Sequence, residues 1–120
     1  MKIQFWTVGK AHESHVKEGT ELFTKRISHY YAVQWNIIPM PKNAGVLSEE
    51  ELKSAEAESI LKLLKKEDYL ILLDERGKQI NSIELADFLQ QRANESIKNL
   101  VFLIGGAYGV SNEVTQRANY

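Results

Sequence analysis

The sequence contains no cysteine and no long hydrophobic run. Without cysteine, neither disulfides nor thiolate metal sites can form, which favours a cytoplasmic protein. No stretch of about eighteen consecutive apolar residues occurs, so the sequence predicts no membrane span. The first residues, Met1–Trp6, have the pattern of a strand and not the form of a signal peptide. We therefore expect a cytoplasmic protein with no membrane partner.

An excess of charge of either sign is also missing. The 15 basic and 16 acidic side chains give a net charge of −1. A protein that holds nucleic acid over its whole surface normally carries an excess of lysine and arginine. Contact with RNA would therefore have to come from a local patch or from the surface of a dimer. The 120 residues, 43% of them hydrophobic, predict a single domain that spans residues 1–120.

Strand-like and helix-like segments alternate along the chain. Strands are expected at residues 2–8, 33–38, 69–73 and 100–104, and helices at residues 13–30, 48–66, 83–93 and 112–120. Two prolines, Pro39 and Pro41, close the second strand, which alternates apolar and polar residues like an edge strand. This order predicts an α/β fold with a mainly parallel sheet and helices on both faces.

The expected helices carry local start signals. Ser48 followed by Glu51 fits a capping box, and Ser82 and Ser111 are placed to cap the next two helices. Gly19 lies inside the first helix, where glycine costs about 1 kcal/mol relative to alanine, and this suggests close packing. The residues expected to face inward from the third helix are Leu85, Ala86 and Leu89.

The most informative stretch is Asn99–Gly109. The apolar run Leu100–Ile104 is typical of a strand buried on both faces. Gly105, Gly106 and Gly109 then allow the backbone to turn and another group to approach closely. A strand, a glycine turn and a helix in this order place a ligand site at the carboxyl end of the strand. The alternative is a tight turn without a ligand, because the spacing fits neither the dinucleotide fingerprint nor a P-loop.

Other candidate residues point to no defined chemistry. His12, Glu13 and His15 resemble a metal cluster, but they lack the spacing of a zinc helix, and a solvated helix start is the simpler interpretation. We expect no metal. Asp74 and Glu75 follow the strand at 69–73, where a carboxylate can be functional or can belong to a solvated turn. The sequence supports no catalytic residue.

Four segments taken together resemble one protein family. They are 8–10 (Val-Gly-Lys), 21–27 (Glu-Leu-Phe-Thr-Lys-Arg-Ile), 73–78 (Leu-Asp-Glu-Arg-Gly-Lys) and 102–109 (Phe-Leu-Ile-Gly-Gly-Ala-Tyr-Gly). Their order and spacing resemble the ribosomal RNA large-subunit methyltransferase H family (RlmH type) of the SPOUT superfamily. The resemblance runs in register over the whole chain, with Arg117 and Ala118 among the last matching residues.

The resemblance implies a SPOUT-like α/β fold that binds S-adenosylmethionine and forms a homodimer. It implies methylation of nitrogen 3 of a pseudouridine in 23S rRNA, on the assembled ribosome. It also implies that the methyl donor contacts Leu73 at the end of the third strand. Further donor contacts are implied at Gly105 and Gly106, in the turn after the fourth strand.

The family pattern continues beyond the matching region with a fifth strand, a Pro-His turn and a long helix that form a knot. The sequence ends at Tyr120, before that segment. We therefore expect the knot-forming segment to be absent and methyl transfer by the 120-residue chain to be impaired. Two alternatives are a non-catalytic binding or dimerisation module and an unrelated flavodoxin-like or nucleotide-binding domain.

Overall fold

Four parallel strands form the sheet of this protein. The computed structural model describes residues 1–9, 14–106 and 108–120. The strands are β1 (Lys2–Val8), β2 (Ala32–Ile38), β3 (Tyr69–Leu73) and β4 (Asn99–Ile104). Their order in the sheet is β2-β1-β4-β3, and every neighbouring pair is parallel. The expected α/β fold with a parallel sheet is confirmed, with β2 at an edge and the apolar β4 inside.

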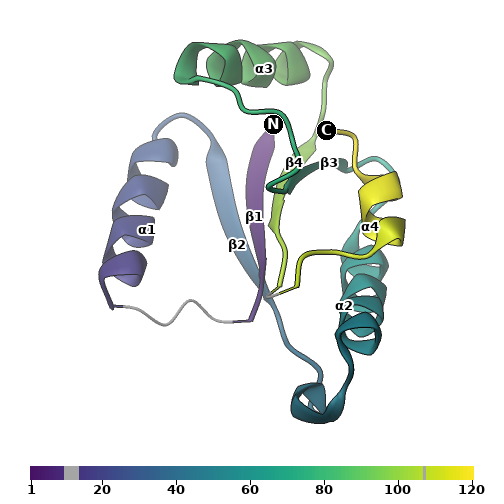
Figure 1. Ribbon diagram of the computed structural model, residues 1–120. Helices are drawn as coiled ribbons and strands as arrows, with labels where there is room; N and C mark the ends of the chain where they lie inside the picture. The colour runs from purple at the N-terminus through teal and green to yellow at the C-terminus, as the bar shows by residue number, and fades with distance from the viewer. Residues whose placement is uncertain (10–13, 107) are drawn as a thin grey trace.

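The helices fall into two groups, one for each face of the sheet. They are α1 (Ser14–Ile27), α2 (Glu49–Leu63), α3 (Ser82–Asn94) and α4 (Asn112–Arg117), with a short 3-10 helix, η1 (Ala44–Val46). Helices α2 and α4 lie together on one side, and α1 and α3 lie apart from them (Figure 1). Leu70 packs in the core with α2 and α4, whereas the ring of its neighbour Tyr69 meets Phe88 of α3. Trp35 of β2 donates a hydrogen bond to Thr24 of α1, and its ring stacks on Phe5, the neighbour of the core residue Trp6. Successive strand residues point to opposite faces, so the two groups cover opposite faces.

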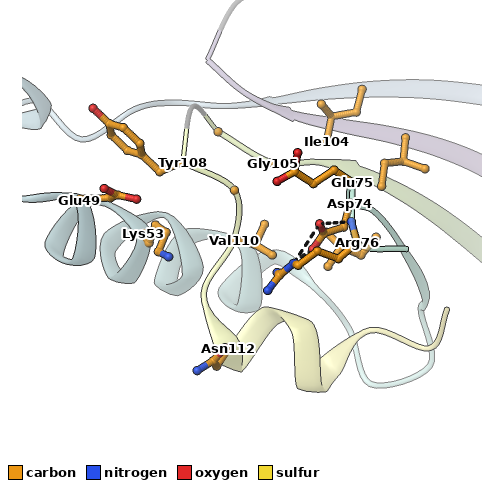
Figure 2. A pocket seen from close by; sticks show the side chains of 14 residues that line it. Glu49, Lys53, Asp74, Glu75, Arg76, Ile104, Gly105, Tyr108, Val110 and Asn112 are labelled. Atoms are coloured by element: carbon orange, nitrogen blue, oxygen red, sulfur yellow. Dashed lines mark hydrogen bonds and ion pairs between the residues drawn. The ribbon is translucent and has the colours of Figure 1, made fainter. Parts of the chain in front are cut away.

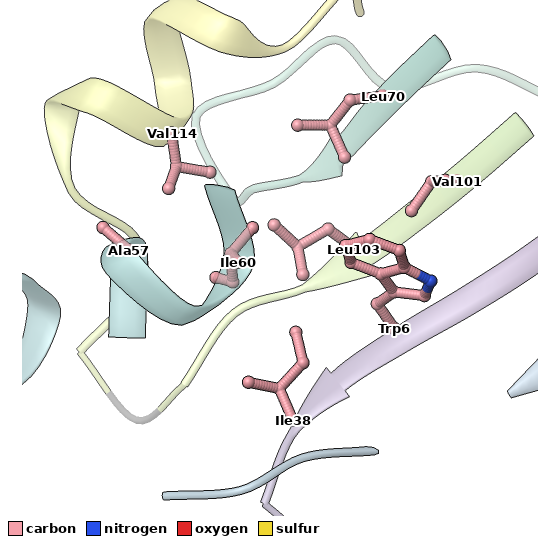
Figure 3. Packing of buried hydrophobic residues seen from close by; sticks show 8 residues of the cluster. All are labelled: Trp6, Ile38, Ala57, Ile60, Leu70, Val101, Leu103 and Val114. Atoms are coloured by element: carbon pink, nitrogen blue, oxygen red, sulfur yellow. The ribbon is translucent and has the colours of Figure 1, made fainter. Parts of the chain in front are cut away.

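The hydrophobic core lies under α2 and α4. Its buried members come from all four strands and both helices, as Figure 3 shows: Trp6, Ile38, Ala57, Ile60, Leu70, Val101, Leu103 and Val114. In β4, Val101 and Leu103 point into this core, as alternation along a strand requires. Ile60 of α2 and Val114 of α4 close the core from the helix side. This packing fixes the start of α4 next to α2.

The helix starts follow the sequence signals in two cases out of three. Ser48 and Glu51 form the expected capping box, and the Ser111 side chain accepts a hydrogen bond from the Val114 backbone nitrogen. Helix α3 is capped by Asn81 instead of Ser82, because the Asn81 side chain accepts a hydrogen bond from the Glu84 backbone nitrogen. The expectation for Ser82 is therefore wrong by one residue.

The helices on the second face are packed less closely than the sequence pattern suggests. Helix α1 ends at Ile27, three residues before the expected end at residue 30. A Cβ built on Gly19 would meet no described atom within 4 Å, so close packing there is not found. In α3, which the structure describes in full, no residue is buried, and Leu85 is 37% exposed. None of the helices in the described residues is long and apolar enough to span a membrane.

Candidate functional site

A hollow of about 640 Å³ opens at the carboxyl ends of β3 and β4. The turn after β3, the glycine turn after β4 and the start of α2 form its walls (Figure 2). Leu73, Gly105 and Gly106 all line it, so the three positions singled out in the sequence lie together. A cavity of this volume is in the usual range for a small-molecule site.

The register of the sheet explains why these residues meet. Leu73 of β3 is the partner of Ile104 in β4, so both strands end at the same edge. Both side chains are exposed there, Leu73 by 51% and Ile104 by 40%. The chain turns away after each strand and leaves space between the two turns, as is typical of open parallel sheets.

The glycine turn folds tightly on itself. The Gly109 backbone nitrogen donates a hydrogen bond of 3.1 Å to the Gly106 carbonyl oxygen, and Gly109 has a positive φ of 83°. A Cβ on Gly105 would lie 3.0 Å from Val110 Cγ1 and 3.3 Å from the carbonyl carbon of Gly109. A side chain at Gly105 would therefore press on the returning chain, and its neighbours would have to move by a few tenths of an ångström.

Gly106 has a different neighbour. A Cβ on Gly106 would lie only 2.5 Å from Glu56 Oε2 and 2.8 Å from Glu56 Oε1. Glu56 lies on α2 and is 5% exposed, and burial raises the pKa of its carboxyl group. Glu56 is not among the candidate residues predicted from the sequence. One signal could have found it, because an acidic residue stands between the buried Leu52 and Ile60 at helical spacing.

The turn after β3 is held by its own side chains. The Asp74 carboxylate accepts hydrogen bonds from the Arg76 backbone nitrogen at 3.0 Å and from Arg76 Nη2 at 2.8 Å. These side-chain and backbone hydrogen bonds lower the pKa of Asp74 below its ordinary value. The Gly77 backbone nitrogen donates to the Asp74 carbonyl oxygen at 2.9 Å. Asp74 therefore shapes the wall of the hollow and stays ionised.

Charged side chains of both signs surround the hollow. Glu49, Asp74 and Glu75 are acidic, and Lys53 and Arg76 are basic. Figure 2 shows Glu49 and Lys53 on the α2 side and the other three in the turn after β3. Neither histidine nor serine occurs among the described residues that line it. The arrangement suits a polar ligand that carries both charges.

The histidine pattern near the first helix cannot be placed. His12 and Glu13 lie outside the described residues, as does the side chain of His15. Within the residues that the structure does describe, no three histidine, aspartate or glutamate side chains are grouped as a metal ion requires.

Comparisons with known proteins agree with the family resemblance. A family model described as "Predicted SPOUT methyltransferase" matches residues 1–120. A protein of Cytophaga hutchinsonii named "Ribosomal RNA large subunit methyltransferase H" is 44% identical over 119 residues, which are 99% of this chain and 76% of that protein. Proteins with the same name from Christiangramia forsetii and Flavobacterium johnsoniae are 37% and 40% identical, over 99% and 98% of the chain and 76% and 75% of their own lengths.

Proposed function

Since the chain belongs to the SPOUT methyltransferases, in the ribosomal RNA large-subunit methyltransferase H family, we propose that it methylates ribosomal RNA with S-adenosylmethionine as the methyl donor. The finer target we propose is nitrogen 3 of a pseudouridine in 23S rRNA. The family match over residues 1–120 also makes the flavodoxin-like alternative wrong. One observation carries the proposal beyond the family. The hollow gathers Leu73, Gly105 and Gly106 at the carboxyl edge of parallel strands.

The residues around the hollow fit the chemistry of the donor. S-adenosylmethionine supplies a methyl group activated by a positively charged sulfur. Glu49 and Glu75 provide negative charge near that cation, since Asp74 is paired with Arg76, and Lys53 can bind the carboxylate of the donor. Backbone groups in the glycine turn can bind polar edges of a ligand without a side chain in the way.

The main contribution of these residues is to hold and orient the donor. Leu73 and the turn at Gly105 and Gly106 bind it from two sides, which fixes the direction of the methyl group. We assign no catalytic residue. The proposed RNA substrate is 23S rRNA in the assembled ribosome, met in the cytoplasm by a homodimer. The net charge of −1 suits docking on a large partner better than holding free RNA.

A second candidate is a module that binds the donor or dimerises without turnover. Asp74 and Arg76 in the lining neutralise each other through an ion pair at 2.8 Å, an arrangement that holds the turn in shape, and this favours the alternative. Donor binding would then remain while methyl transfer is absent or impaired. The two functions differ in one measurable quantity, which is the transfer of methyl groups to RNA.

The test is methyl transfer from labelled S-adenosylmethionine to ribosomes that lack the modification, followed by mapping of the methylated nucleotide. The 44% identical relative from Cytophaga hutchinsonii serves as the comparison enzyme. Calorimetry measures donor affinity in parallel, with Gly19→Ala as a control variant far from the hollow. Methylation of a pseudouridine supports the enzyme, and binding without transfer supports the module. A chain that neither binds the donor nor transfers methyl groups overturns the enzyme, and one that also stays a monomer in sedimentation overturns the module as well.

A further inference from the structure

The position that a side chain at Gly106 would take is occupied by the carboxylate of Glu56. The direction in which a side chain would leave Gly106 points at the Glu56 carboxylate, and both carboxylate oxygens lie within 2.8 Å of the Cβ position. Real Cβ atoms are essentially never found this close to another heavy atom, so any side chain here must displace Glu56 or move the turn. The obstructing atoms are the end of a flexible side chain, but Glu56 is buried in the small space between α2, α4 and the turn, which limits how far it can move away. The absence of a side chain at Gly106 therefore serves an internal contact.

Glu56 lies behind the glycine turn as seen from the hollow. It lines a small space between α2, α4 and the turn, together with Gly106, Gly109 and Val114. It is not among the residues that line the large hollow. Glu56 therefore does not line the hollow itself, and the residues that border both spaces are Lys53 and those of the turn.

The burial of the Glu56 carboxylate costs folding free energy. A buried carboxylate without compensation lowers the stability of a fold, and buried ionisable groups beside clefts are often tied to function. The titratable group that shares the small space is Lys53, on the same helix, and Lys53 Nζ lies 3.8 Å from Glu50 Oε1. From α4 and β1, the described residues that border the space are Ser111, Val114 and Val8, which do not titrate.

We propose that Glu56 is a positioning residue that holds the glycine turn in its donor-binding place through its contact with Gly106. The inference rests on the proposed function only for the identity of the ligand. The proposal also gives a different reason why position 106 is a glycine. Substitution of Gly106 is harmful because of Glu56, and not because the donor occupies the Cβ position.

The proposal predicts mutual rescue. Gly106→Ala places a methyl group on the carboxylate and should weaken S-adenosylmethionine binding by about tenfold or more. Glu56→Ala removes the support and should weaken binding moderately. In the double variant the clash is gone, so its Kd should return to within about threefold of that of Glu56→Ala. Glu56→Gln keeps the shape and should bind nearly as the native chain does.

The experiment measures Kd for S-adenosylmethionine by calorimetry and the free energy of unfolding in urea, for each variant. Glu58→Ala, an exposed glutamate on the same helix, is the matched control and should change neither quantity. Additive effects of the two substitutions on Kd would overturn the proposal, as would unchanged binding in Gly106→Ala. Poor binding of S-adenosylmethionine by Glu56→Gln would show that the charge of Glu56, and not the space that its side chain fills, holds the turn.

The unfolding measurement keeps this inference separate from the proposed function. If the native chain does not bind S-adenosylmethionine, the proposed function fails. The coupling between Glu56 and Gly106 is then read from stability alone. Non-additive free energies of unfolding support the contact, and additive ones overturn it.

Discussion

Helix α2 buries Leu52, Glu56, Ala57 and Ile60 against the sheet, whereas α3, of similar length and fully described, buries none of its residues. Both helices carry apolar residues three and four positions apart, so both have an apolar face. The difference comes from what lies beneath them. Under α2, the sheet and α4 provide a continuous apolar surface, with Leu103 and Val114 fully buried.

The face covered by α1 and α3 carries aromatic rings that stack on each other across the strands. Phe5 stacks on Trp35 at 4.8 Å and on Phe102 at 5.5 Å between ring centroids. Tyr69 meets Phe88 of α3 edge-on at 6.0 Å. Leu85 and Ile83 of α3 stay exposed. The comparison shows that the candidate site is anchored on the more closely packed face, because α2 supplies Glu56 behind the glycine turn.

The largest expected effect is a difference in the free energy of unfolding between two leucine substitutions, one on each face of the sheet. Leu103→Ala removes a fully buried side chain and should lower the free energy of unfolding by about 2–5 kcal/mol. Leu85→Ala, in the exposed α3, should lower it by less than about 1 kcal/mol. Urea unfolding of both variants measures the contrast. Equal losses of unfolding free energy in the two variants would show that both faces of the sheet contribute equally to stability.

The next effect concerns the glycine turn on the packed face. Gly105→Val forces a side chain against Val110 and Gly109 and should destabilise the fold by about 1–3 kcal/mol. The fold should survive, as circular dichroism can check, while S-adenosylmethionine affinity falls by about tenfold or more. Gly45→Val, where a Cβ would meet no described atom within 4 Å, is the control. Unchanged affinity by calorimetry would remove Gly105 from the site.

A smaller effect of opposite sign is expected on the loosely packed face. Gly19→Ala adds a methyl group in open space within α1 and should stabilise the protein by about 0.5–1 kcal/mol. The gain comes from helix propensity alone, so donor affinity should stay unchanged. A loss of stability in thermal unfolding would mean that a methyl group at Gly19 meets a neighbour, contrary to the open space around its Cβ position.

The smallest effect is a change with pH. The raised pKa of Glu56 means that the folded protein binds more protons than the unfolded chain from the ordinary value of 4.5 up to the raised value. Stability of the native protein therefore falls as pH rises through that window, and the loss persists above it. Glu56→Gln does not titrate, so it should be the more stable protein at neutral pH. This advantage should disappear in acid below pH 4.5, as urea unfolding at several pH values can test.

Strand positions were predictable because their signals are local. The apolar runs at residues 69–73 and 100–104 coincide with β3 and β4 to within one residue. The capping box at Ser48 likewise depends only on residues three apart. The inward face of α3 was not predictable in the same way, since burial depends on the surface that a helix meets.

The sequence by itself determined the α/β order, the strand ends and the glycines that follow β4, because periodicity and turn residues act over a few positions. Only the tertiary structure decided which residues face one another across that turn. It placed Leu73 beside Ile104 through the register of parallel strands. It also brought Glu56, about fifty positions earlier in the chain, against Gly106. Contacts between distant residues follow from the packing of α2 on the sheet, which no short pattern in the sequence records.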